Sequence, residues 1–285
     1  MILKKILKLG FRELKRIGVS WRDSHASTFG ASVAYYTIFS LAPLLIITVA
    51  IAGIIIDQDF AKIGIINEFT EVFGQSGALF VDSLLNSATP QSSNVFLIIA
   101  GFIIIILGAT GIFSELEAAL DSIFEAEPKK SRGLRGTLRE KLLSIGMVMS
   151  VGFLLLASLA ASTVVTALSD FLSSRIPGGD FLARTAEIVI SFVLIWIFLT
   201  FLYRFLPSKK IGNHASLIGG LIAGTFFTIG KYALGIYLGS SSTVSVYGSA
   251  AALVLIIVWA YYMAQIFFLS SILVKLYFLK EPKKI

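Results

Sequence analysis

Residues Ala31 to Ile56 read "ASVAYYTIFSLAPLLIITVAIAGIII", a stretch without a charged side chain. The hydrocarbon core of a bilayer is about 30 Å thick and takes roughly 20 apolar helical residues to cross, so this stretch predicts a membrane span. The basic segment before it is typical of a secretory signal, but the stretch is longer than the apolar region of a signal peptide and no persuasive small-residue cleavage site follows. We therefore interpret it as an uncleaved first span.

Five further stretches meet the same length criterion. The six predicted spans are 31–56, 95–113, 142–168, 185–206, 215–238 and 250–279. Hydrophobic residues make up 56% of the 285 residues and charged residues only 14%, which argues against a single water-soluble globule with a charged surface. Backbone groups find no water in hydrocarbon, so such spans form helices. The expected fold is an all-α bundle of six transmembrane helices.

Basic residues gather on alternate connections between these spans. Of the 24 lysines and arginines, 20 lie before the first span, around the second and fourth connections, or at the end of the chain. Because positively charged loops stay in the cytoplasm, both termini are predicted to be cytoplasmic. Residues 23–285 then form the transmembrane domain, and residues 57–94 form its largest outer loop, in which two short amphipathic helices are expected.

The segment 1–22 combines an apolar stripe with basic side chains. Its apolar stripe consists of Leu3, Leu7, Leu14 and Ile17. A helix of this kind lies in the membrane interface, and its positive charge attracts anionic lipid headgroups at the cytoplasmic face. The alternative is an arm that binds a partner protein.

Four stretches carry a family resemblance. They are "AYYTIFSLAPLL" (34–45), "TGIFSELEAALDSIF" (110–124), "LYRFLP" (202–207) and "GKYALGIYLGSSSTVSVYGSAAALVLIIVWAYYMAQIFF" (230–268). With these motifs in this order, the chain from about Asp23 to Tyr277 resembles the YihY/BrkB family of bacterial inner-membrane proteins. The resemblance implies six helices in the bacterial cytoplasmic (inner) membrane. The family once carried a ribonuclease label, and lipid or solute export is suggested for some members.

One stretch departs from that family pattern. Ser270, Ser271 and Ile272 stand where the family tends to have a Gly-Ala-Glu-like step. No role for a carboxylate is therefore carried over to this part of the last span.

Polar groups share one face of the first span. Tyr36, Ser40 and Pro43 are spaced i, i+4 and i+7, and Thr37 lies beside them. Pro43 cannot donate a hydrogen bond to the carbonyl of Phe39, which predicts a kink. The face either locks the bundle by bonding to a neighbouring helix, or lines a polar cavity or hinge that moves during transport.

Lys231 interrupts the fifth span, and Glu187 enters the fourth span at a similar expected depth. A charge at that depth is costly unless it is paired or hydrated, so these residues predict a buried charge pair. The alternative is that Lys231 extends to the outer interface while Glu187 lies among headgroups.

Small residues recur every four positions along the fifth span. They are Gly212, Ser216, Gly220, Gly224 and Thr228. A smooth strip lets another helix approach closely, which predicts helix packing at Gly220 and Gly224. A sliding interface would use the same geometry and is the alternative.

Gly111 and Glu117 belong to the motif at the cytoplasmic end of the second span. Glu117, Asp121 and Glu125 share a helix face, and like charges so placed usually form a solvated surface bonded to nearby lysines or arginines. The alternative is a gate at Gly111 and Glu117.

The last span is polar and aromatic along one side. The residues concerned are Tyr247, Trp259, Tyr262 and Gln265. They form either an interfacial aromatic belt with packing contacts or a wall that faces the substrate.

These features favour an integral membrane protein that is not an enzyme. The first hypothesis is a transporter or flippase-like protein for an amphipathic lipid or small solute; with no Walker motif, it would use a gradient or run downhill. The second is an envelope scaffold that does not transport. The third, a ribonuclease, is weak because His25 and His214 stand alone and the basic loop at 129–141 follows from topology.

The residues also lead us to expect no cofactor, no metal and no nucleic-acid partner. The chain contains no cysteine, which excludes disulfides, thiolate metal sites and cysteine nucleophiles. The expected partners are membrane lipids and a lipid or small-solute substrate, and the sequence leaves the oligomeric state open.

Overall fold

The computed structural model describes residues 2–55, 58–87, 95–126, 157, 179–240 and 251–279. Every regular element in these ranges is an α-helix, which confirms the all-α class for this part of the chain. The helices are α1 (Ile2–Asp23), α2 (Ala26–Ile55), α3 (Gln58–Ser87), α4 (Val95–Ile123), α6 (Gly179–Phe205), α7 (Asn213–Ser240) and α9 (Ala251–Phe278). The predicted third span, 142–168, lies outside the described residues except for Ala157.

Helices α2, α4, α6, α7 and α9 cover the predicted first, second, fourth, fifth and sixth spans. Two of them contain stretches long and apolar enough to cross a bilayer, Ile188–Phe205 in α6 and Leu253–Phe278 in α9. The count of six spans and the cytoplasmic side of both termini stay predictions.

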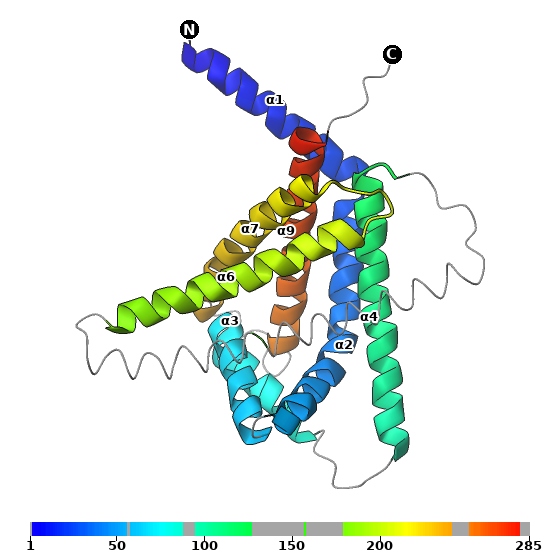
Figure 1. Cartoon of the computed structure of the whole chain (residues 1–285), viewed down its shortest axis with the longest axis vertical. Helices are drawn as coiled ribbons and strands as arrows, with labels where there is room; N and C mark the ends of the chain where they lie inside the picture. Colours follow the sequence, from blue (N-terminus) through cyan, green and yellow to red (C-terminus); the bar gives the residue numbers. More distant parts are fainter. Residues whose placement is uncertain are drawn as a thin grey trace.

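Helix α9 is the centre of the bundle, because it contacts α1, α2, α3, α4 and α7. Figure 1 shows α2, α4 and α9 running along the long axis of the molecule, while α6 and α7 pack against each other and cross these three. The side chains of α9 therefore meet those of helices from every part of the described chain.

The main core lies where the ends of α4, α6 and α9 meet. Phe124 and Tyr203 are almost completely buried there. The hydroxyl of Tyr203 donates a hydrogen bond to the carbonyl of Phe267 at 2.9 Å, and the hydroxyl of Ser271 donates to the same carbonyl at 2.8 Å. Tyr203 of the "LYRFLP" motif thus links α6 to α9. Ser270 and Ser271, which depart from the family pattern, are buried in this core.

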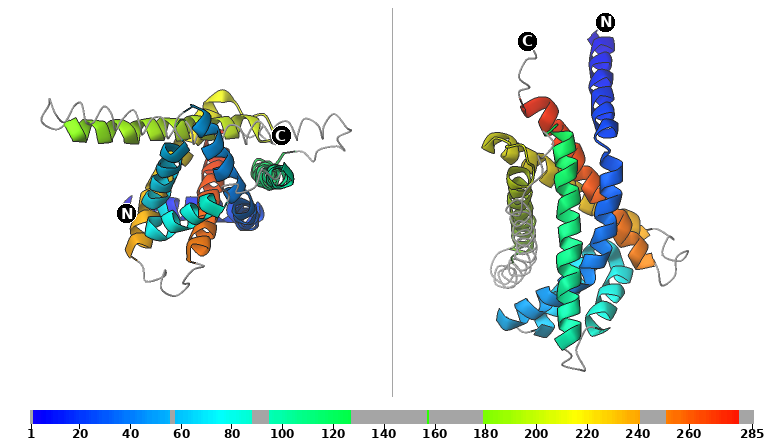
Figure 2. Two further views of the ribbon diagram at one scale, coloured as in Figure 1. Left: turned by 90° about the horizontal axis from the view of Figure 1, so that it is seen from below. Right: turned by 90° about the vertical axis from the view of Figure 1, so that its right-hand side faces the viewer.

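The ribbon of α2 changes direction between its two halves, as Figures 1 and 2 show. Helix α2 is continuous and contains a single proline, Pro43. Proline removes one intrahelical hydrogen bond and is an ordinary cause of such bends. The side chain of Pro43 is outside the described residues, and motion about it stays a prediction.

Helix α3 occupies the segment expected to be the outer loop, 57–94, and doubles back on itself. Gly74 has φ 64° and ψ −162°, a conformation that is essentially restricted to glycine. Across the turn, Lys62 pairs with Asp82 at 3.1 Å and donates to the side chain of Asn86 at 2.6 Å. The hairpin packs Ile65, Val81 and Leu85 against Leu45 and Val49 of α2.

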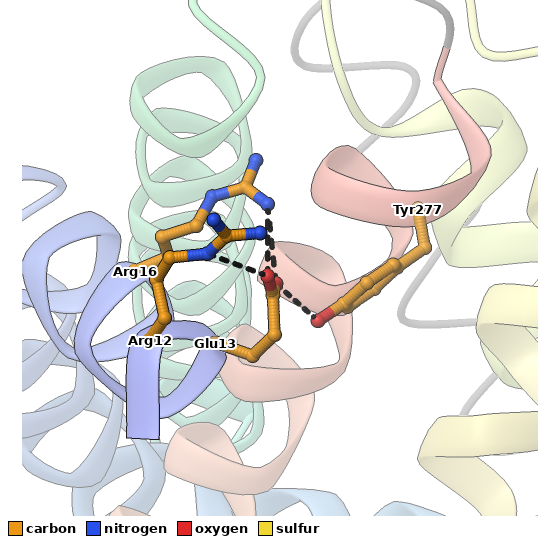
Figure 3. Close-up of polar contacts among 4 residues, drawn as sticks. All are labelled: Arg12, Glu13, Arg16 and Tyr277. Carbon is orange, nitrogen blue, oxygen red and sulfur yellow. Dashed lines mark hydrogen bonds and ion pairs between the residues drawn. The ribbon is translucent and has the colours of Figure 1, made fainter. Parts of the chain in front are cut away.

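Helix α1 extends away from the bundle, beside the end of α9 (Figures 1 and 2). Figure 3 shows the contact between the two: the hydroxyl of Tyr277 donates to Glu13 at 2.9 Å, and Arg16 pairs with the same carboxylate at 3.1 Å. The start of α2 and the end of α9 therefore lie at one end of the molecule. Docking of segment 1–22 in the membrane interface stays a prediction.

Large apolar side chains are exposed along the outer faces of α6, α7 and α9. They include Val189, Ile197, Phe201, Leu217, Ile229 and Val258. A water-soluble protein rarely exposes apolar surface on this scale, whereas lipid-facing helices require it.

Candidate functional site

A cavity of about 180 Å³ lies among five helices of the bundle and is partly open to its surroundings. Its walls come from α2, α4, α6, α7 and α9, with α9 supplying the most residues. The lining residues are Val33, Thr37, Leu116, Leu199, Leu202, Ala223, Phe227, Trp259, Ala260, Met263, Ala264, Ile266 and Phe267.

The chemistry of this cavity is almost wholly that of hydrocarbon. The hydroxyl of Thr37 donates within its own helix to the carbonyl of Val33 at 2.8 Å. Trp259 is the other lining residue with a polar atom, and its indole Nε1 is buried without a hydrogen-bond partner among the described residues. The accessible surface of the cavity is therefore almost entirely apolar.

Aromatic rings hold Trp259 in place. Phe73, from the α3 hairpin, meets the Trp259 ring edge to face with 5.6 Å between centroids. Phe227 of α7 meets it at 6.2 Å, again edge to face. Such pairs are favourable orientations for aromatic rings, and through Phe73 the hairpin packs against the first half of α9.

The three polar residues predicted on this face of the first span separate into two sets. Thr37 lines the cavity, whereas Tyr36 and Ser40 face α4. A Cβ added to Gly111 would lie 2.6 Å from Cγ of Tyr36, and one added to Gly108 would lie 2.8 Å from Cβ of Ser40. The geometry of Tyr36 and Ser40 is that of close helix packing, the first of the two alternatives for this face.

Gly111 and Glu117 occupy different surroundings, although both lie in one motif. Gly111 accommodates the Tyr36 ring, while Glu117 lies two turns further along α4, near the connection between α6 and α7. The hydroxyl of Ser208 in that connection is 3.5 Å from Glu117. The structure thus places the two predicted gate residues apart.

Asp121, next along the face of Glu117, binds this connection more closely. Its carboxylate accepts the backbone N–H of Ser208 at 2.7 Å and the Ser208 hydroxyl at 2.6 Å. Lys209 donates to the carbonyl of Phe124 at 2.8 Å, and Glu125 pairs with Lys275 at 2.8 Å. The acidic run is therefore bonded to basic and polar groups at one end of the bundle.

Lys231 and Glu187 lie on the paired helices α7 and α6. Gly220 packs on Thr200 and Gly224 on Trp196, and continuing this antiparallel register brings Lys231 within a turn of the level of Glu187. The side chain of Glu187 is outside the described residues. The charge pair stays a prediction, and the backbone register is compatible with it.

The small-residue strip on α7 faces α6 where the two helices are closest. A Cβ on Gly220 would lie 2.8 Å from the backbone nitrogen of Thr200, whereas one on Gly224 would meet its nearest neighbour, Phe192, at 3.7 Å. Gly212 has open space around it. Gly220 is therefore the point of closest approach.

The residues predicted as a substrate-facing wall on the last span lie in different surroundings, and the wall stays a prediction. Trp259 lines the cavity, Tyr262 is exposed, and Gln265 is buried against the start of α2, where its Nε2 donates to the carbonyl of Ala26 at 3.2 Å. Tyr247 lies outside the described residues.

Most of the cavity wall was not identified from the sequence. Val33, Leu116, Ala223 and Met263 are ordinary apolar residues, and nothing in a single sequence separates a cavity-lining side chain from a packed one. Among the described residues, no three His, Cys, Asp or Glu side chains gather where they could hold a metal ion.

Comparison with known proteins places this architecture in a family. The profile of the virulence factor BrkB family matches residues 19–277. The chain belongs to the virulence factor BrkB family. The predicted resemblance is thereby confirmed, and the chain is a membrane protein of this family.

Curated relatives of the chain carry the name UPF0761 membrane protein. Those of Xanthomonas oryzae pv. oryzae (strain PXO99A) and Xanthomonas campestris pv. campestris (strain B100) are each 24% identical over 245 residues, which cover 85% of this chain and 55% of the relative. The relative from Xanthomonas axonopodis pv. citri (strain 306) is 24% identical over 245 residues, 85% of this chain and 56% of its own length. The chain thus spans about half the length of these relatives. No solved structure matches it significantly.

Proposed function

We propose that this protein is a transporter or flippase-like protein of the bacterial inner membrane, and that it takes the hydrocarbon portion of an amphipathic lipid into the cavity between α2, α4, α6, α7 and α9. The single observation that carries this proposal is the apolar lining of that cavity. A small ionic solute would be poorly solvated there, whereas an acyl chain would lose no hydrogen bonds on entry.

The size of the cavity supports uptake of part of a lipid. Pockets that enclose a drug-sized ligand measure about 300–1,000 Å³, and this one measures about 180 Å³. The rest of the lipid would stay outside the cavity, and the exposed apolar side chains of α6 and α9 suit its hydrocarbon.

The position of Lys231 favours an anionic lipid as the substrate. It follows Phe227, a lining residue, by four positions on α7, so the two side chains leave the same face of the helix one turn apart. A cation one turn beyond the apolar wall suits a phosphate group. This extends the predicted role of Lys231 from a charge pair to the headgroup of the substrate.

Lipid translocation in proteoliposomes tests the proposal. Headgroup-labelled phosphatidylglycerol is reconstituted with the protein, and an impermeant reductant quenches only the label in the outer leaflet. The wild type is expected to expose inner-leaflet label to the reductant, and Ala223→Leu, which fills the cavity from α7, is expected to slow this exposure severalfold. Ala233→Leu is the matched control, because Ala233 is exposed on the same helix.

Equal rates for the wild type, both variants and empty liposomes would overturn lipid translocation. The scaffold hypothesis would then account better for the molecule, with α1 and the α3 hairpin as its contact surfaces. RNA cleavage by the purified protein would favour the ribonuclease hypothesis instead.

A further inference from the structure

The basic helix α1 contains a single acid, and that acid ties it to α9. Glu13 is the only Asp or Glu in residues 1–22. The hydroxyl of Tyr277 donates a hydrogen bond to Oε2 of Glu13 at 2.9 Å. Nη1 of Arg16 lies 3.1 Å from the same oxygen, and Nε of Arg12 lies 3.9 Å from Oε1 (Figure 3). Glu13 thus holds α1 against the end of α9.

The two arginines around Glu13 are largely exposed. The exposed fraction of the side chain is 72% for Arg12 and 52% for Arg16. Residues four apart lie on the same side of a helix, one turn apart, so the two guanidinium groups can act on one ligand. Guanidinium groups bind phosphate oxygens through paired hydrogen bonds. Arg12 and Arg16 therefore form a candidate phosphate site, in which the carboxylate of Glu13 takes the place of the phosphate.

The apolar face of α1 is only partly covered by the bundle. Ile17 and Trp21 are partly buried and pack against the main core. Leu14, which is spaced i, i+3 and i+7 with them on one side of the helix, is 69% exposed. A helix that combines such a face with cationic side chains binds in the membrane interface, where tryptophan is favoured. Charge complementarity therefore favours an anionic lipid surface as the partner of α1.

The joint between α1 and α2 is suited to a change in the direction of α1. His25 has φ 53°, a left-handed conformation that is uncommon for a residue other than glycine. Backbone strain of this kind is frequent in segments that switch between conformations. Ser24 is buried, and its carbonyl accepts a hydrogen bond from the hydroxyl of Ser122 at 3.3 Å. The joint is thus anchored to α4, and α1 extends beyond it.

We propose that α1 is a hinged arm that senses anionic lipid at the membrane surface on its side of the bundle. The phosphates of that surface bind the guanidinium groups of Arg12 and Arg16. They also repel the carboxylate of Glu13, which releases Tyr277, and α1 turns about His25 until its apolar face lies in the lipid. Exposed ion pairs contribute little to stability, so a surface that attracts every lysine and arginine of α1 can replace them. This inference goes beyond lipid uptake into the cavity and does not depend on it.

Two spin labels in the full chain provide the test, because the chain has no cysteine of its own. Lys15→Cys on α1 and Lys210→Cys between α6 and α7 place the labels at exposed positions. The protein is reconstituted in nanodiscs of phosphatidylcholine, or of equal parts phosphatidylcholine and phosphatidylglycerol. Double electron–electron resonance measures the distance between the labels. One distance is expected in phosphatidylcholine, and a second distance is expected to become the major population with phosphatidylglycerol.

Two arginine variants separate the phosphate site from the overall charge of α1. Arg16→Gln removes the closer of the two guanidinium groups around Glu13 and keeps the hydrogen bond from Tyr277, so the first distance is expected to stay the major population with phosphatidylglycerol. Arg22→Gln is the matched control, because it removes one positive charge from an exposed side chain of the same helix outside the contact with Glu13. The shift to the second distance is expected to persist in this control.

Two further measurements examine the latch and the source of the phosphate. Tyr277→Phe removes the hydroxyl that binds Glu13, and is expected to produce the second distance in phosphatidylcholine alone. Inorganic phosphate added to the wild type in phosphatidylcholine is expected to leave the first distance unchanged, because it offers no surface for the apolar face of α1.

Each part of the inference can be overturned separately. A single distance for the wild type in both kinds of nanodisc would contradict the hinged arm. Loss of the shift in both Arg16→Gln and Arg22→Gln would replace the phosphate site by a general effect of charge. A shift caused by inorganic phosphate would exclude the lipid surface as the required partner. All of these results leave lipid uptake into the cavity to be decided by Ala223→Leu.

Discussion

The aromatic ring of Tyr36 on α2 lies directly against Gly111 on α4. A Cβ at position 111 would come within 2.6 Å of Cγ of Tyr36, a separation that packed side chains do not tolerate. Both residues belong to motifs that carry the family resemblance, and the contact joins two helices far apart in the sequence. The glycine thus makes room for the tyrosine.

Gly111→Ala is therefore expected to destabilise the protein by about 1–3 kcal/mol, the usual cost of forcing an extra group into a packed interface. The measurement is the thermal unfolding of the detergent-purified protein. Tyr36→Ala removes the ring. The double variant Gly111→Ala/Tyr36→Ala is therefore expected to lose less stability than the sum of the losses in the two single variants. Strict additivity would contradict the contact.

Asp121 fastens the connection between α6 and α7 by accepting two hydrogen bonds from Ser208, at 2.7 and 2.6 Å. Asp121→Ala is expected to lower the free energy of unfolding by about 1 kcal/mol. A buried hydrogen bond to a charged acceptor contributes somewhat more than this, but the two hydrogen bonds to Ser208 are exposed. The adjacent Lys209 and Lys210 provide a local readout: trypsin should cleave there faster in the variant.

Glu115→Ala is the control for this prediction, since Glu115 is an acid on the same helix outside these hydrogen bonds. Cleavage at Lys209 and Lys210 should match the wild type. Equal cleavage in all three proteins would show that Asp121 does not hold the connection closed.

Hydropathy located the helices but not all of their ends. The predicted second span stopped at Phe113, where continuous apolar sequence gives way to alternating polar residues, yet α4 continues to Ile123. Leu116, Leu120 and Ile123 are buried in the main core, so packing and not lipid stabilises this extension. A length criterion set by the bilayer cannot detect it.

The polar residues of the first span show a second limit of prediction. The sequence places Tyr36 and Thr37 side by side, and helical geometry cannot say which neighbour each one meets. In the structure, Tyr36 packs against α4 and Thr37 lines the cavity. Deciding between packing and a cavity required the position of α4, which depends on contacts distant in the sequence.

Replacing two glycines of the strip on α7 by alanine is expected to change the stability of the protein in opposite directions. Gly220→Ala places a Cβ 2.8 Å from the backbone nitrogen of Thr200 and should destabilise the α6–α7 pair by about 1–3 kcal/mol. Gly224→Ala meets nothing closer than 3.7 Å, and alanine is favoured over glycine inside a helix by about 0.5–1 kcal/mol. Apparent melting temperatures should fall for the first and hold or rise for the second. Equal losses would mean that both positions are in tight contact.

The predicted topology can be tested with single cysteines, because the chain has none of its own. Thr70 on the α3 hairpin and Lys15 on α1 are both exposed, so Thr70→Cys and Lys15→Cys should react equally once the membrane is permeabilised. In intact cells, an impermeant maleimide should label Thr70→Cys alone, because the basic segment around Lys15 is predicted to stay in the cytoplasm. Labelling of Lys15→Cys in intact cells would place α1 outside and would require the opposite orientation of the bundle.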